Sequence, residues 1–175
     1  MDQTKHSGIS IGRIRFLFSE GGRVFCGDTN NRIFSFNSET GLWEILIGSL
    51  SANPLGCAYF DEDYYFITYN QAIYKYDGKE VSTIKTPSGD SNNCYEAIIA
   101  NTEKMIIAGK SSGKPCLWTL NVKSNPINIS RSELTETGAI CDICKIDDKT
   151  FFAGGQKGQI HLIKDTNTGL EVISD

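Results

Sequence analysis

The segment GKSSGKP, residues 109 to 115, has the glycines and lysines of a phosphate-binding loop. A Walker A loop places four residues between its glycines, a Ser or Thr after its lysine, and a helix N-terminus against the phosphate. Here three residues separate Gly109 from Gly113, Pro115 follows Lys114, and the apolar run CLWTL comes next. Because that run is typical of a strand, we predict a turn between two strands and no nucleotide site.

Cys141 and Cys144 form a CxxC motif, which in other proteins holds zinc or performs redox chemistry. Side chains alternate along a strand, so residues three apart point to opposite faces and cannot bind one ion together. The chain has no second CxxC, and its two histidines are His6 and His161. We therefore predict structural cysteines, no metal ion and no other cofactor.

The acidic side chains are poorly placed for catalysis. Asp61, Glu62 and Asp63 are adjacent in a predicted turn, and together with Asp90 they suggest a calcium site or a carboxylate pair. Adjacent acids in a hairpin turn are, however, normally solvated. His161 lies in a strand slot that aromatic residues fill elsewhere in the chain, which indicates a packed side chain. The chain also lacks a Gly-x-Ser-x-Gly motif, so we predict that it is not an enzyme.

The composition is that of a soluble globular protein, with 39% hydrophobic and 22% charged residues and a net charge of −4. No segment is strongly basic, so a sequence-independent grip on nucleic-acid phosphates is not expected. The N-terminus lacks a secretory signal, and no apolar run reaches the length of about 18 residues needed to span a membrane. The cysteines lie in apolar runs, as in a reducing compartment. We expect a cytoplasmic or nuclear protein.

An internal repeat organises the chain. The segment FFAGGQKGQIHLI, residues 151 to 163, has the composition of two strands joined by a tight turn. Similar segments occur at 24–36, 64–76 and 105–120. If Gly27, Thr68, Gly109 and Gly154 are taken as equivalent, the steps between them are 41, 41 and 45 residues.

Each unit reads as four short antiparallel strands, and no window has the spacing of an amphipathic helix. The second strands, near 23–27, 64–69, 105–109 and 150–154, are the most apolar, which predicts central positions buried on both faces. We predict an all-β array of four β-propeller blades over residues 13–175, after a lead-in or outer strand at 1–12. The blades are expected at about 13–47, 56–84, 94–130 and 138–173.

The four units resemble WD-repeat blades, a resemblance that covers nearly the whole chain from about Ile14. The family's Gly-His pair is absent, and its Trp-Asp dipeptide is replaced in each unit. The replacements are Phe36-Asn37, Tyr76-Asp77, Leu120-Asn121 and Lys164-Asp165. Kelch-like blades are the alternative, because Gly154-Gly155 and the segment FNSETGLWEIL, residues 36 to 46, are similar to that family.

The WD-repeat resemblance implies a protein-interaction scaffold. Its binding face would be lined by the turns between second and third strands and by the links from each outer strand to the next inner one. The residues expected there are Asp28, Asn30, Asn31, Arg32, Tyr69, Asn70, Lys110, Lys114, Gln156 and Lys157. One alternative is a small propeller enzyme or carbohydrate-binding protein with a carboxylate-lined channel, although the first strands carry only Glu96 and Asp142. Another is a structural subunit of a large assembly.

The number of blades predicts assembly. Four units are at the lower limit of the 4 to 8 blades that propellers usually have, and blades of this type suit a ring of about seven. We expect an incomplete ring that is completed by a second copy, by another propeller chain or by further sequence. A closed four-bladed ring is the alternative. An open array would leave apolar flanks exposed to water.

Overall fold

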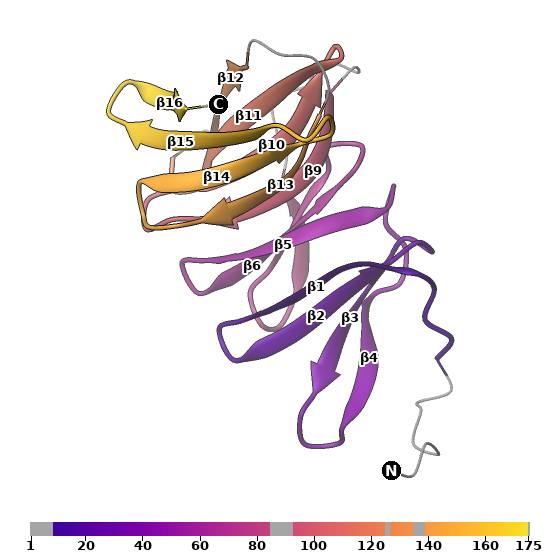
Figure 1. Cartoon of the computed structure of the whole chain (residues 1–175). Helices are drawn as coiled ribbons and strands as arrows, with labels where there is room; N and C mark the ends of the chain where they lie inside the picture. Colours follow the sequence, from indigo (N-terminus) through magenta and orange to yellow (C-terminus); the bar gives the residue numbers. More distant parts are fainter. Residues whose placement is uncertain (1–8, 85–92, 125–126, 135–138, 175) are drawn as a thin grey trace.

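The computed structural model describes residues 9–84, 93–124, 127–134 and 139–174. These residues form sixteen strands and no helix. In particular, no helix in this part of the chain is long and apolar enough to cross a membrane. The strands make four antiparallel sheets of four, each built from consecutive strands, so the all-β prediction is confirmed (Figure 1).

The first sheet contains β1 (Ile14–Glu20), β2 (Arg23–Asp28), β3 (Arg32–Asn37) and β4 (Leu42–Ile47). The second contains β5 (Pro54–Phe60), β6 (Asp63–Thr68), β7 (Ile73–Tyr76) and β8 (Val81–Ile84). The third contains β9 (Asn93–Ala100), β10 (Met105–Ser111), β11 (Lys114–Asn121) and β12 (Asn128–Glu133). The fourth contains β13 (Ile140–Lys145), β14 (Thr150–Gly155), β15 (Ile160–Thr166) and β16 (Gly169–Ser174). The predicted central strands correspond to β2, β6, β10 and β14.

The alignment of the repeats differs by one residue from the predicted one in two units. Gly27 pairs with Ile33 as Gly154 pairs with Ile160, and the corresponding positions in the second and third sheets are Ile67 and Ala108. The steps are therefore 40, 41 and 46 residues. Gly109 is not the equivalent of Gly27 and Gly154. A glycine is required there for a different reason, the close approach of a neighbouring strand. A Cβ atom there would lie 2.0 Å from the carbonyl oxygen of Cys94 on β9.

The sheets pack face to face in chain order. Phe25 and Phe66, whose ring centroids are 5.3 Å apart, lie in the core between the first and second sheets. Trp118 and Tyr95, at 5.1 Å, belong to the core between the second and third sheets. Phe151 and aliphatic residues such as Ile106 fill the space between the third and fourth sheets. Aromatic pairs of this kind add to the stabilisation from burial alone.

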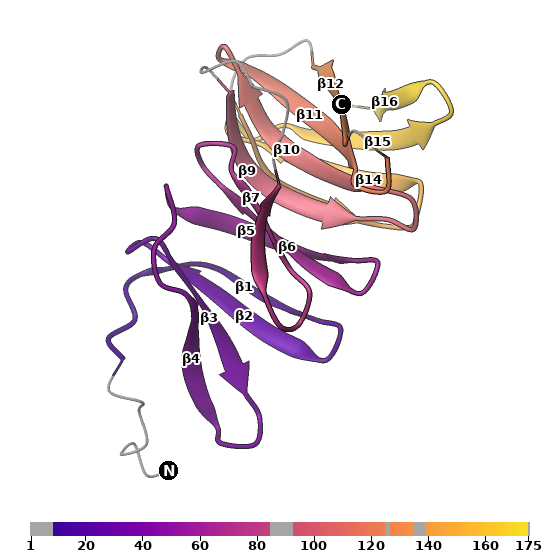
Figure 2. The ribbon, with the colours of Figure 1, turned by 180° about the vertical axis from the view of Figure 1, so that it is seen from behind.

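The array is open. The first sheet lies at one end of an arc and the fourth sheet at the other, with the inner strands β1, β5, β9 and β13 side by side along it (Figures 1 and 2). Of the four sheets, as far as the structure describes them, each packs extensively only on the sheets before and after it in the chain. The expected incomplete ring is therefore what the chain forms, and the four-bladed ring is not closed.

Candidate functional site

The hairpins between the second and third strands all lie on the same face of the array, where these strands meet. We call this face the hairpin rim. It comprises residues 29–31, 69–72, 112–113 and 156–159 with the flanking strand ends. The first, second and fourth of these hairpins are hydrogen-bonded to segments that lead into inner strands, either of their own sheet or of the next. The amide of Leu50 donates to the Asn31 carbonyl at 2.8 Å, that of Tyr69 to Asn53 at 3.0 Å, and that of Gln156 to Ala139 at 2.8 Å. The rim is therefore a rigid platform.

Asp28 supports the first hairpin from inside. Its carboxylate accepts hydrogen bonds from the amides of Gly12, Asn30 and Arg32 at 2.9–3.1 Å, and from the Arg32 guanidinium at 2.6 Å. Burial opposes ionisation of this group, but these hydrogen bonds outweigh burial and lower the pKa of Asp28. Asp28 has no exposed surface, so the expectation that it contacts a partner is corrected: it holds Asn30 and Arg32 in place.

The second hairpin presents an aromatic side chain. Tyr69 is 43% exposed, and a hydrogen bond with the Cys94 thiol is the main reason why the pKa of its phenol is raised. Beside it, the Thr68 hydroxyl donates to the Asn70 side chain at 2.7 Å, and the Asn70 amide donates to the Ser51 hydroxyl at 3.0 Å. Asn70 is thus exposed but fixed. An exposed, well-held tyrosine is a common anchor in protein interfaces.

The third and fourth hairpins present lysines and amides. The third turns through Ser112 and Gly113, both with positive φ, which confirms the predicted turn in place of a phosphate loop. Lys114 pairs with Glu133 at 3.6 Å while remaining exposed. In the fourth, Gln156 is exposed and the backbone amide of Lys157 donates to the Gln159 side chain at 3.0 Å.

The similarity of this chain to known proteins is a similarity of fold. No family model matches the chain, and no curated protein matches it. Among solved structures, it is similar to "Structure of U3-55K" (TM-score 0.62, 18% identity) and to "Crystal structure of RRP9 WD40 repeats" (0.60, 18%). Each match covers 81% of this chain and 42% of the other.

The fold is that of WD40-like propeller blades. The WD-repeat resemblance is therefore confirmed, and the chain spans 42% of the length of each WD40 structure. The computationally designed Ika4 protein is also similar, with a TM-score of 0.67 and 15% identity over 94% of this chain and 99% of that one. At these identities the likeness concerns the fold.

The hairpin rim of the WD40-like array carries charge of one sign. Within residues 28–32, 68–73, 110–114 and 155–160, the basic side chains are Arg32, Lys110, Lys114 and Lys157. The single acid in these segments is Asp28, which is buried. Arg32 pairs with Asp28 and Lys114 with Glu133, so the hairpins carry a small excess of positive charge although the whole chain has a net charge of −4.

The inner strands do not form a carboxylate-lined channel. Bulges in the inner strands place Glu96 level with Arg15, Leu55 and Cys141, so one acid stands in this row. Burial raises the pKa of Glu96, although Lys110 and Arg15 act in the opposite direction. Asp142 is outside this row because it pairs with Gly154 on β14, and its carboxylate accepts a hydrogen bond from the amide of Ile143 at 2.8 Å. This row offers no carboxylate pair for glycoside chemistry.

The predicted acidic turn is held in ion pairs. Asp61 pairs with Lys123 at 3.0 Å and Asp63 with Lys75 at 2.5 Å, while Asp90 lies outside the described residues. Within the described ranges, no three His, Cys, Asp or Glu side chains cluster as metal ligands. This turn therefore has a structural explanation in the part of the chain that the structure describes.

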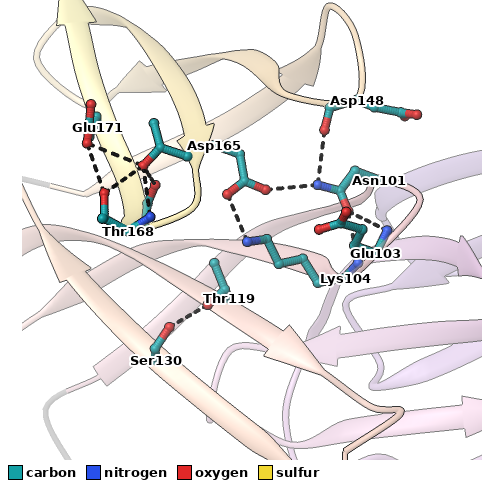
Figure 3. A network of polar contacts seen from close by, with 11 residues as sticks. Asn101, Glu103, Lys104, Thr119, Ser130, Asp148, Asp165, Thr168 and Glu171 are labelled. Carbon is teal, nitrogen blue, oxygen red and sulfur yellow. Dashed lines mark hydrogen bonds and ion pairs between the residues drawn. The ribbon is translucent and has the colours of Figure 1, made fainter.

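A buried polar network lies on the face of the array opposite the hairpin rim, and it was not predicted from the sequence. Asp165 on β15 accepts hydrogen bonds from Lys104 at 2.8 Å and Asn101 at 3.1 Å, and Asn101 also donates to the Asp148 carbonyl at 3.1 Å (Figure 3). The network joins the β9–β10 turn to the fourth sheet beside a polar hollow of about 290 Å³. Its groups satisfy one another, so it locks two blades together. The dipeptide Lys164-Asp165 was the only signal in the sequence.

Proposed function

We propose that this WD40-like array is a non-catalytic scaffold that binds segments of other proteins at its hairpin rim. The observation that carries the proposal is the set of four equivalent hairpins, which present Tyr69 beside exposed polar side chains. Three of these hairpins are hydrogen-bonded to segments that lead into inner strands. A rigid sheet framework with side chains displayed on turns is a common way for proteins to carry a binding surface. The candidate contacts are Asn30, Asn31, Arg32, Tyr69, Asn70, Lys110, Lys114, Gln156 and Lys157.

The charge of the rim favours an acidic partner. Its exposed charged side chains are basic, so an extended segment with Asp or Glu side chains beside an apolar anchor is complementary to it. Tyr69 would pack on the apolar anchor. Electrostatic attraction of this kind weakens at high ionic strength, which gives the interaction a measurable signature.

A display library of random peptides tests this function. Peptides selected on the immobilised chain should be enriched in Asp and Glu, and salt should weaken their binding. Tyr69→Ala should weaken the selected peptides about tenfold or more, as expected for an aromatic anchor. Lys114→Ala should weaken them by a smaller factor.

Lys123→Ala is a matched control. Lys123 is also an exposed lysine in an ion pair, but it lies in the β11–β12 turn, on the face of the array opposite the hairpin rim. Its substitution should leave peptide binding unchanged. Peptides that ignore Tyr69→Ala and Lys114→Ala, or that are lost with Lys123→Ala, would place the binding surface elsewhere.

The compartment is part of the proposal. All six cysteines are free thiols, which fits a reducing environment such as the cytoplasm or nucleus. Fluorescence microscopy of the tagged chain in its native cells tests this assignment, and secretion of the chain would contradict it.

A further inference from the structure

The first and fourth sheets each have one face on which no other described sheet packs. On the first sheet this face includes Leu17, which is 69% exposed, together with Ile45 and Phe36. On the fourth it includes Phe152 and Ile160, which are 44% and 64% exposed. Isolated exposed apolar residues are ordinary on proteins, but these form two coherent sheet faces at the two ends of the arc (Figure 1).

Equivalent positions in the first three sheets are buried where the free face of the fourth sheet is exposed. Strand pairing assigns each position in the fourth sheet an equivalent in the first three. Every equivalent of Phe152 and Ile160 is at most 2% exposed. The equivalents of Phe152 are Phe25, Tyr65 and Ile106, and those of Ile160 are Ile33, Ile73 and Leu117. In the interior of the array, a following sheet covers these positions.

The free face of the first sheet resembles the face by which the fourth sheet packs on the third. Ile14 and Leu17 occupy the positions that Ile140 and Ile143 occupy in the fourth sheet. Ile140 and Ile143 are both buried in the core shared with the third sheet. Ile14 and Leu17 therefore have the side chains and the position to pack on a preceding sheet, and the described residues contain no sheet that precedes them.

The two faces are complementary in shape. On the fourth sheet, Gly154 leaves an open apolar hollow of about 500 Å³ between Phe152 and Ile160, with nothing within 4 Å of the place of a Cβ atom. On the first sheet, Leu17 projects into solvent.

We propose that a second copy of this chain completes the ring. The fourth sheet of each copy packs on the first sheet of the other, so that two identical contacts close a ring of eight blades. Such head-to-tail contacts form closed rings when the rotation per subunit permits, and eight blades lie within the range known for propellers. Each new contact repeats the packing that already joins the third and fourth sheets, with Ile14 and Leu17 in place of Ile140 and Ile143.

The size of the faces is sufficient for a stable dimer. A face of four strands about 4.8 Å apart and about six residues long is about 19 Å by 20 Å, or roughly 380 Å². The ring would contain two contacts with two faces each, and would bury about 1,500 Å² in total. Stable protein interfaces usually bury about 1,200–2,000 Å².

Sedimentation equilibrium of the purified 175-residue chain tests the proposal. At micromolar concentration the mass should be about 39 kDa, twice the 19.3 kDa of one chain. Leu17→Arg and Ile160→Arg should each weaken dimerisation about 100-fold or more, because each places a charge in an apolar contact. Both residues are exposed in the single chain, so circular dichroism should show the folded spectrum for both variants.

A mixture of the two variants gives the decisive result. A Leu17→Arg copy keeps an intact fourth-sheet face, and an Ile160→Arg copy keeps an intact first-sheet face. The mixture therefore restores one of the two contacts and should dimerise at concentrations where neither variant does alone. Val81→Arg, which changes an exposed apolar residue on the outer strand β8, is the control and should leave the dimer intact.

Three outcomes would overturn the proposal. A 19.3 kDa monomer at high micromolar concentration would show that a second copy does not cover these faces. Loss of the dimer with Leu17→Arg alone, and not with Ile160→Arg, would mean that like faces pair. A mass that grows without limit as concentration rises would mean that the head-to-tail contact forms open chains. None of these results tests peptide binding at the hairpin rim. Because Ile160 borders the fourth hairpin, Leu17→Arg is the variant that separates the two proposals.

Discussion

Replacing Trp118 by alanine should destabilise the chain more than any change at the hairpin rim. The indole is buried in the core between the second and third sheets, where it makes an edge-to-face contact with Tyr95. Phe60 and Tyr65 of the second sheet belong to the same core. The substitution therefore removes a side chain that joins two blades, in addition to filling the interior of one.

The size of the loss follows from burial. An indole removes about 200 Å² of mostly apolar surface from water, which corresponds to at most about 5 kcal/mol. Substitutions of this kind generally cost about 3–5 kcal/mol, because a cavity remains. For a chain of this size, each kcal/mol lowers the melting temperature by about 2–4 °C, so Trp118→Ala should lower it by about 10 °C.

Circular dichroism is the suitable assay, because the chain has only two tryptophans and the substitution removes one fluorescent probe. Lys114→Ala is the control and should change the free energy of unfolding by less than about 0.5 kcal/mol. Both variants must be melted at the same protein concentration, since association would make the melting temperature depend on it. Equal losses for the two variants would show that Trp118 does not contribute to the core.

Three other substitutions test individual features. Because the pKa of Asp28 is lowered, its stabilisation is fully present above its unfolded pKa and is lost as the pH falls through the folded one. Asp28→Asn should therefore lower the melting temperature more at about pH 7 than at about pH 3, and equal losses would contradict this. Asp165→Ala leaves Lys104 unpaired and should cost about 2 kcal/mol in urea denaturation; a neutral result would mean that the network is not a lock. Gly109→Ala should cost about 2 kcal/mol or more, because its Cβ would lie 2.0 Å from the carbonyl oxygen of Cys94; a loss below about 0.5 kcal/mol would show that the β9 approach is misplaced.

The repeat could be predicted because strand composition and turn residues recur along one dimension. Apolar runs at regular intervals locate β2, β6, β10 and β14 without any knowledge of their neighbours. The fine alignment could not be obtained in this way. Gly109 looks like a repeat anchor in the sequence, but its small size is required by the approach of β9, a strand paired through a bulge.

Contacts between sheets were beyond the reach of the sequence. Lys104 and Asp165 are 61 residues apart and meet only because two blades pack together. Asp28 was predicted to face a partner since it lies at a polar turn, yet its hydrogen bonds with Gly12 and Arg32 bury it. The prediction of the turns was therefore easier than the prediction of which turn residues are available to other molecules.

Because each sheet consists of consecutive strands, no strand has to return from the C-terminus to complete the first sheet. Every backbone ladder can form within a stretch of about 40 residues, so the loop-closure entropy of pairing distant chain ends is avoided. A chain emerging from the ribosome can finish each blade before the next is made, as in other repeat proteins. The strands of each sheet can then pair in the order of synthesis, and only the packing between sheets requires parts of the chain that are far apart in sequence.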